Sequence, residues 1–303
     1  MTGTTPTTPE PARHAARTSR RRRRVIVIVA GGLVAAAAIG TGVVLTSDGG
    51  EVVAAAVTPA AADGYRAPAS STTARLPAAV YDAVIPGLVP YTATDVAGIT
   101  RTATITADAP LYGTDRKTPV GRLQAKDFLG EPTTVVPVKT TGSWTLVLTP
   151  ARVSLPSKTK GAAAAQSAGW IRTDLLTKGL TLDARVVVSV AKQTLTITRG
   201  DQTVSYPVGV GTADAPTPTG VTGYLQARYL DPKQGQSTYP IQLTSLHSAA
   251  QDEPYKGSDG GLIGAHYADT ATGAVSHGCI RLTHAAIAAV NQLPLGSPIT
   301  ITD

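Results

Sequence analysis

Short runs in which apolar and polar residues alternate dominate the chain from Arg101 onward. TATITADAPLYG, TPVGRL, PTTVVPVKTTGSWTLVLTP and AGWIRTDLL are runs of this kind, bounded by Gly, Pro, Asp and Thr. Alternation with a period of two is typical of strands that bury one face, and the bounding residues favour turns. The pattern therefore predicts a β-rich segment over residues 101–178.

A second β-rich pattern begins at Thr181. The runs Arg185–Val190, Thr194–Thr198 and Thr203–Val208 are joined by the short turns AKQ and RGDQ, which predicts an antiparallel meander. Thr283 suits the N-cap of a helix over HAAIAAVNQL, whose apolar spacing gives one buried face, and GSPITIT reads as a closing strand. We expect a mostly β domain over 181–303 with one short helix, able to fold by itself.

The N-terminal part of the chain has a different pattern. Residues 1–24 end in five arginines, and Val25–Thr46 follows with 22 residues and no charge. About 20 apolar residues span a bilayer, and arginines before such a span stay on the cytoplasmic side. We expect a basic cytoplasmic tail at 1–24 and an uncleaved transmembrane helix at 25–46. A cleaved signal peptide is the alternative.

Two stretches lack a sustained period. Residues 47–100 are rich in Ala, Thr, Pro, Gly and Val, which predicts a linker, although 79–98 are apolar enough to pack on the β-rich segment after them. Within the first β-rich segment, Ser154–Gly169 is rich in Ala, Ser and Lys, and we expect a mobile surface loop there.

The charge of the chain is concentrated in its tail. Seven arginines and one glutamate in residues 1–24 contribute +6 of the formal net charge of +7, which leaves +1 for everything after them. The positive net charge therefore reflects the predicted membrane topology. Residues 25–303 are nearly neutral in sum, which argues against binding to nucleic acid.

Candidate chemistry gathers around a single thiol. Cys279 is the only cysteine, and the four histidines 247, 266, 277 and 284 lie within 38 residues that include it. One cysteine excludes an intrachain disulfide, and a neighbouring histidine can turn a thiol into a nucleophilic thiolate. Backbone N–H groups of a tight turn at His277, Gly278 and Cys279 could stabilise an oxyanion. A zinc site is the competing use, but no second Cys completes a ligand set.

The residues around Cys279 resemble a known signature. SHGCIRL, residues 276–282, is similar to the motif of the L,D-transpeptidase catalytic domain of the YkuD type, and PVGVGTADAPTPTGVTGYL and IGAH support the resemblance. It covers residues 183–303. GSWTLV and GWIRTDLL within 101–178 resemble a bacterial SH3-like module, a small β-barrel that would bind wall peptides or act as a spacer.

The resemblance implies roles for individual residues. Cys279 would be the nucleophile and His266 its base, because His266 ends the apolar run GGLIGAH just before the loop that returns to the cysteine. His277 and Gly278 would shape the oxyanion turn, and Ser276 would orient its neighbours. Arg281 would hold a carboxylate or carbonyl of the substrate. His247 is followed by Ser, as the family often has after its base, and it remains the alternative base.

The resemblance also implies a function. We expect a membrane-anchored, extracytoplasmic L,D-transpeptidase that cross-links peptidoglycan stem peptides through a cysteine thioester, needs no cofactor or metal, and is acylated by carbapenem-type β-lactams. Water or a protein amine as acceptor would instead give an L,D-carboxypeptidase or a protein-to-wall ligase. A non-catalytic cell-wall-binding protein is the alternative from another class.

Overall fold

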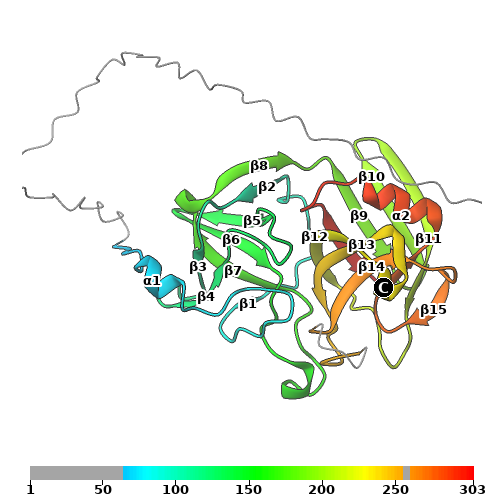
Figure 1. Cartoon of the computed structure of the whole chain (residues 1–303), viewed down its shortest axis with the longest axis horizontal. Helices are drawn as coiled ribbons and strands as arrows, with labels where there is room; N and C mark the ends of the chain where they lie inside the picture. Colours follow the sequence, from blue (N-terminus) through cyan, green and yellow to red (C-terminus); the bar gives the residue numbers. More distant parts are fainter. Residues whose placement is uncertain (1–63, 255–259) are drawn as a thin grey trace, which may run out of the picture. The chain divides into compact units, whose positions relative to one another are not determined.

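The computed structural model describes residues 64–254 and 260–303 (Figure 1). The predicted tail 1–24, the predicted anchor 25–46 and the first part of the predicted linker lie outside the described residues. Within the part that is described, no helix is long and apolar enough to cross a membrane.

The first part of the described chain is a set of short strands with little helix. Its strands are β1 (Val89–Pro90), β2 (Arg101–Thr104), β3 (Ala109–Tyr112), β4 (Pro119–Leu123), β5 (Val136–Thr141), β6 (Trp144–Thr149), β7 (Ser167–Arg172) and β8 (Thr177–Thr181), and its helical turns are α1 (Ser70–Thr73), η1 (Pro156–Lys158) and η2 (Thr173–Leu175). A six-stranded sheet has the order β4-β3-β7-β6-β5, with β1 paired to β7, while β2 and β8 form a separate pair. The segment 101–178 is therefore β-rich, as its alternating pattern predicts.

Residues that precede this segment belong to its core. Ala79, Ile85 and Leu88 are buried among the apolar side chains of the six-stranded sheet. The apolar stretch 79–98 of the predicted linker thus packs on the β-rich segment, as expected. The likeness of 101–178 to an SH3-like barrel stays a prediction.

The prediction of a mobile surface loop over Ser154–Gly169 is wrong for its second half. Ala163 and Gln166 are buried, and β7 begins at Ser167. The Gln166 side-chain amide donates to the Thr149 carbonyl at 2.8 Å. A buried amide that finds partners is stabilised rather than mobile, and the alanine-rich sequence contains no period that would show this.

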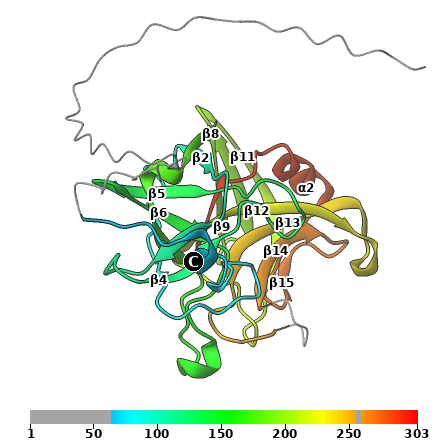
Figure 2. The same ribbon diagram turned by 60° about the vertical axis from the view of Figure 1, so that its left-hand side comes forward.

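The second part of the described chain forms the larger sheet. Its strands are β9 (Ala184–Ser189), β10 (Thr194–Arg199), β11 (Gln202–Gly211), β12 (Val221–Asp231), β13 (Gln236–His247), β14 (Leu262–Tyr267), β15 (Gly273–Ser276), β16 (Ile280–Leu282) and β17 (Pro298–Thr302), and its helical elements are η3 (Pro232–Gln234) and α2 (His284–Asn291). The nine strands have the order β10-β9-β17-β12-β13-β14-β16-β11-β15. Because β10 also pairs with β11, the order closes on itself. In both views β12, β13 and β14 run side by side (Figures 1 and 2).

Several predicted elements of this part are confirmed. Strands β9, β10 and β11 form the expected antiparallel meander. Thr283 caps α2, because its hydroxyl oxygen accepts a hydrogen bond from the Ala286 N–H at 3.3 Å. Ile287 and Val290 are buried on one face of the helix. The closing strand β17 pairs in parallel with β9.

The two sheets share buried contacts, and the described residues fall within one compact unit. Tyr224 of β12 is buried with Val136 and Leu148 of the first sheet. Arg152, only 2% exposed, donates hydrogen bonds to the carbonyl oxygens of Ser248 at 2.8 Å and Asp252 at 2.9 Å. The predicted boundary near residue 180 therefore runs between strands that pack on a common core.

Candidate active site

The strands that carry the predicted nucleophile and base are neighbours. β14 and β16 pair in parallel, and His266 lies opposite Arg281 in their register. Cys279 comes immediately before β16, and the Gly264 N–H of β14 donates a hydrogen bond to its Sγ atom at 3.4 Å. The sulfur of Cys279 is therefore held against the strand that carries His266.

The two faces of this strand pair differ in character. Along a strand, successive side chains point to opposite faces. One face belongs to the apolar core, to which the pair contributes Ile263, Ala265, Ile280 and Leu282. Alternation places Cys279, His266 and Arg281 together on the opposite face.

That opposite face borders a cavity of about 610 Å³, a size that suits part of a peptide substrate. Cys279 and His266 both line it. The other lining residues are Tyr81, Phe128, Leu129, Tyr229, Asp231, Gln234, Ile241, Leu243, Leu262 and Gly264. The predicted nucleophile and base thus open onto one space.

His266 is held in the form that a general base requires. Its Nδ1 atom lies 3.0 Å from the Tyr267 carbonyl oxygen, and since a carbonyl can only accept, Nδ1 carries the proton. In the neutral ring, the lone pair is then on Nε2. Burial lowers the pKa of His266 below its usual 6.5, and the positive charge of Arg281 lowers it further, against the opposing effect of the Tyr267 hydrogen bond. The ring is therefore neutral at pH 7 and able to accept a proton.

Ser276 organises the turn that precedes Cys279. Its buried hydroxyl donates to the Cys279 carbonyl at 2.5 Å and accepts from the Gly278 N–H at 3.2 Å. Gly278 has φ +112°, where a side chain would be strained, and a Cβ there would lie 3.0 Å from Ile263. The orienting role of Ser276 toward a substrate stays a prediction. The Gly278 N–H, however, is directed to Ser276 rather than to a substrate oxyanion, and His277 is exposed.

Thr217 is a site residue that the sequence did not single out. Its hydroxyl donates to the Gly278 carbonyl at 2.7 Å and accepts from the Gly211 N–H at 2.8 Å, and the side chain is buried. It therefore ties the end of β11 to the cysteine turn. Its only sequence signal is the run PTPTG, which supported the family resemblance without assigning a role to this threonine.

His247, the alternative base, faces elsewhere. It is buried, and its Nε2–H donates to the Tyr81 carbonyl at 2.7 Å. Burial lowers the pKa of His247 to about 4, and the charge of Arg152 acts in the same direction, against the opposing effect of the Tyr81 hydrogen bond. His247 is absent from the residues that line the cavity. The structure thus brings His266, and not His247, to the space beside Cys279.

The remaining histidine of the cluster lies on the surface. His284, in the first turn of α2, is exposed, and its ring contacts those of Tyr239 and Tyr267 at centroid distances of 4.9 and 4.7 Å. Within the described ranges, no three His, Cys, Asp or Glu side chains are grouped so that they could hold a metal ion.

A cysteine beside a neutral histidine, both facing a cavity, is the arrangement of enzymes that use a thiolate nucleophile. Residues 183–301 match the family model of the L,D-transpeptidase catalytic domain, YkuD. The predicted resemblance of residues 183–303 to the L,D-transpeptidase catalytic domain is thus confirmed over 183–301.

Solved structures with some similarity to the chain carry the same family name. An L,D-transpeptidase from Mycobacterium smegmatis is 15% identical, with 53% of this chain and 91% of that chain covered and a TM-score of 0.31. L,D-transpeptidase 1 of Mycobacterium tuberculosis is 18% identical over 45% and 78% of the two chains, with a TM-score of 0.29. L,D-transpeptidase 3 of Mycobacterium tuberculosis, in complex with a faropenem-derived adduct, is 14% identical over 53% and 91%, with a TM-score of 0.32. No curated protein matches the chain.

Proposed function

We propose that the protein is a peptidoglycan L,D-transpeptidase that forms cross-links between stem peptides through a thioester on Cys279. The observation that carries the proposal is the placement of Cys279 and His266 on one face of the β14–β16 pair, beside a common cavity. The family match over 183–301 supports peptidoglycan stem peptides as the substrate class.

In the proposed reaction, Nε2 of His266 takes the Cys279 thiol proton while Sγ attacks the carbonyl carbon of the third residue in a donor tetrapeptide. The tetrahedral intermediate collapses, the bond to the terminal D-alanine breaks, and the imidazolium returns the proton to the leaving amine. An acceptor amine then attacks the thioester, loses its proton to His266 and forms the new amide, which regenerates the thiol. Arg281, beside His266 in the register, would bind a substrate carboxylate or carbonyl.

The same site accounts for a β-lactam as acyl donor. Opening of a lactam ring by Sγ moves the acyl group to sulfur and the proton to the lactam nitrogen, which stays attached to the acyl group. We therefore propose that carbapenem-type β-lactams acylate Cys279.

Intact-protein mass spectrometry with a tetrapeptide stem tests the reaction. We expect the protein mass to rise by one tripeptide acyl group with release of D-alanine, and an added acceptor stem to convert the adduct to a cross-linked dimer. Cys279→Ser should form no thioester, and His266→Ala should be acylated about 10²–10⁴-fold more slowly, the range for loss of a positioned base. His284→Ala, an exposed histidine, is the matched control and should react normally.

The outcomes also separate the alternatives. Release of free tripeptide in the presence of an acceptor stem would indicate an L,D-carboxypeptidase, and an adduct with a protein amine would indicate a protein-to-wall ligase. A pure wall-binding protein would show no adduct at Cys279 with either a stem or a β-lactam.

We further propose that the enzyme works outside the cytoplasmic membrane, held there by residues 25–46, with the module at 101–178 as a wall-binding or spacing element. The uncharged length of 25–46 and the arginines before it support this topology. Membrane fractionation with protease protection tests it, and a freely soluble mature protein that begins after Ala56 would contradict it.

A further inference from the structure

One wall of the cavity comes from residues that precede the catalytic segment by a long stretch of chain. Tyr81, Phe128 and Leu129 line the same space as Cys279 and His266. The Phe128 ring meets the Tyr81 ring edge-on at 5.1 Å and the Tyr229 ring of β12 at 5.9 Å. We refer to Tyr81, Phe128 and Leu129 as the aromatic wall.

The loop that carries Phe128 and Leu129 has a defined shape. The Asp127 side chain accepts hydrogen bonds from the backbone N–H groups of Leu129 at 2.9 Å and Glu131 at 3.0 Å. The Asp127 N–H donates to the Glu131 carbonyl at 2.8 Å, which closes the turn. Hydrogen bonds within the loop, from its backbone and from the Asp127 side chain, therefore fix the tip without any contact with a substrate.

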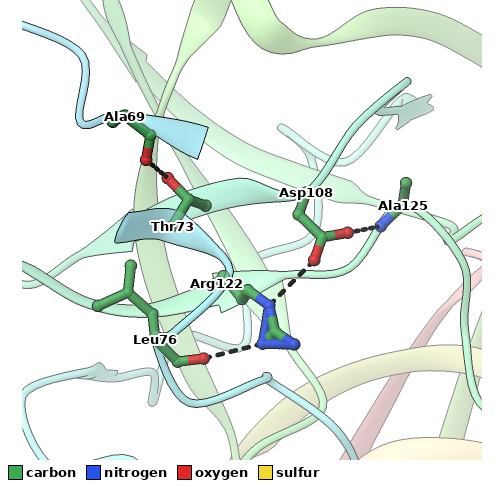
Figure 3. Close-up of polar contacts among 6 residues, drawn as sticks. All are labelled: Ala69, Thr73, Leu76, Asp108, Arg122 and Ala125. Atoms are coloured by element: carbon green, nitrogen blue, oxygen red, sulfur yellow. Dashed lines mark hydrogen bonds and ion pairs between the residues drawn. The ribbon is translucent and has the colours of Figure 1, made fainter. Parts of the chain in front are cut away.

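The base of this loop is held by Asp108, the residue directly before β3. Asp108 accepts from the Ala125 N–H at 3.0 Å and from Arg122 Nε at 3.0 Å, and Arg122 also donates to the Leu76 carbonyl at 2.8 Å (Figure 3). Two carboxylate oxygens of one residue thus connect β4 to the start of the loop.

The third member of the wall is attached to the catalytic segment itself. The Tyr81 carbonyl accepts the hydrogen bond of buried His247 at 2.7 Å. The Tyr81 side chain packs against the small apolar cluster that includes Leu243 and Leu262, two further lining residues of the cavity. These contacts join the aromatic wall to Leu243 and Leu262 of the cavity lining.

Core packing does not explain why the loop ends in apolar residues. Phe128, the only phenylalanine of the chain, is 39% exposed, and Leu129 is 42% exposed. Two adjacent, exposed apolar side chains on a hydrogen-bonded turn at the edge of the cavity offer a contact surface for a ligand.

We propose that the aromatic wall determines which donor the enzyme accepts, by covering the methylene chain of the third residue of the stem peptide. This inference rests on the proposed function. The residue whose carbonyl is attacked lies nearest to Sγ of Cys279, so its side chain is the part of the donor that enters the cavity. In a stem peptide, that side chain is the long aliphatic chain of a diamino acid, which an apolar wall can remove from water.

The test compares two tetrapeptide donors that differ only at the third residue, one with the diamino acid and one with alanine. We expect the wild-type protein to prefer the diamino-acid donor in kcat/KM, and the double variant Phe128→Ala, Leu129→Ala to lose about tenfold of this preference through KM. Leu175→Ala, a leucine of similar exposure (41%) that does not line the cavity, is the matched control and should keep the preference. An unchanged preference in the double variant, with an unchanged melting temperature, would overturn the proposal.

A second measurement is independent of the peptidoglycan reaction. Alkylation of Cys279 by iodoacetamide, a small reagent, should have the same rate in the double variant as in the wild type. Alkylation by the bulkier N-phenylmaleimide should become about tenfold faster in the double variant, because the aromatic wall no longer blocks the larger reagent. If neither donor acylates the wild type but the ratio of the two alkylation rates still shifts, the proposed function fails, while the position of the aromatic wall beside the thiol is supported. If the ratio does not shift, the wall does not border the thiol and the inference fails.

Discussion

The tautomer of His266 is fixed by one hydrogen bond. Because the Tyr267 carbonyl occupies the Nδ1–H, the free lone pair is on Nε2, and the register with β16 places the ring on the face that carries Cys279. The sequence predicted the pairing of Cys279 with His266 through the position of GGLIGAH before the cysteine loop. It could not give the tautomer or the role of Thr217, because both depend on backbone groups that come together only in the folded chain.

The pKa of His266 should respond to Arg281. The arginine charge disfavours a second positive charge on the ring, so its removal in Arg281→Gln should move the pKa of His266 upward, toward 6.5. The ring accepts a proton only when neutral, so the fall in the acylation rate at acidic pH should begin at a higher pH in the variant. A titration of the histidine ring signals by NMR, with His266→Gln to assign them, measures the shift directly.

A second variant controls for the general effect of removing a positive charge from the protein. Lys233→Gln removes a positive charge from exposed η3 and should leave the pKa of His266 in place. A pKa of His266 that is the same in Arg281→Gln and the wild type would show that the two side chains do not interact.

Among the elements, the short strands and the helix could be predicted from local patterns and the irregular segments could not. The meander β9–β11 follows from the local alternation of apolar and polar residues. The cap at Thr283 follows from the preference of threonine for the N-cap position of a helix. The buried end of the predicted loop Ser154–Gly169 was missed because its order comes from distant partners, such as Ser245, whose hydroxyl donates to Gln166 at 2.6 Å.

The connection between β11 and the cysteine turn depends on one hydroxyl. Thr217→Val keeps the shape of the side chain and removes both hydrogen bonds, so the buried Gly211 N–H and Gly278 carbonyl lose a partner. We expect the free energy of unfolding to fall by about 1–3 kcal/mol and acylation of Cys279 to slow. Urea unfolding and the acylation rate, measured on the same preparation, check the two effects.

Thr219→Val is the matched control, because Thr219 lies two residues away and is exposed. It should change neither quantity. Equal behaviour of the two valine variants would mean that Thr217 does not support the turn.

At the scale of the molecule, the structure shows contacts across the boundary predicted near residue 180. A new pattern of alternating runs begins at Thr181, which predicts a domain that folds by itself. Packing of Tyr224 among residues of the first sheet and the hydrogen bonds of Arg152 are long-range contacts, which local patterns do not contain.

A fragment of residues 181–303 should therefore be less stable than residues 64–303, contrary to that expectation. It exposes Tyr224 and leaves the buried His247 without the Tyr81 carbonyl, which together should cost roughly 3–5 kcal/mol of unfolding free energy. Urea unfolding and limited proteolysis of both fragments measure the difference. Equal stability of the two fragments would show that residues 181–303 fold independently of the residues before them.

The pH dependence of stability should report the buried His247. Its pKa is about 4 in the folded chain and near 6.5 when unfolded, so between these values the unfolded state binds more protons. Its contribution is present above pH 6.5 and is lost progressively as the pH falls from 6.5 through 4; about 2 kcal/mol of it is lost between pH 7 and pH 5. Urea unfolding at both pH values should show this loss.

His247→Gln is the comparison for this experiment. Its amide can still donate to the Tyr81 carbonyl but has no charge to gain, so the loss between pH 7 and pH 5 should be smaller by about 2 kcal/mol in this variant. The same loss in both proteins would mean that His247 is not buried in its neutral form.

The distance along the chain between the loop at Phe128 and the thiol at Cys279 has a bearing on how such enzymes diverge. Substitutions in the loop alter one border of the cavity and leave every residue of the 183–301 match untouched. Under the proposed function, selection for a different cell-wall chemistry or against a bulky antibiotic can then act on the loop while Cys279 and His266 stay the same. To tell apart the substrates of two proteins that share the motif around the cysteine, one would then have to compare the residues upstream of that motif.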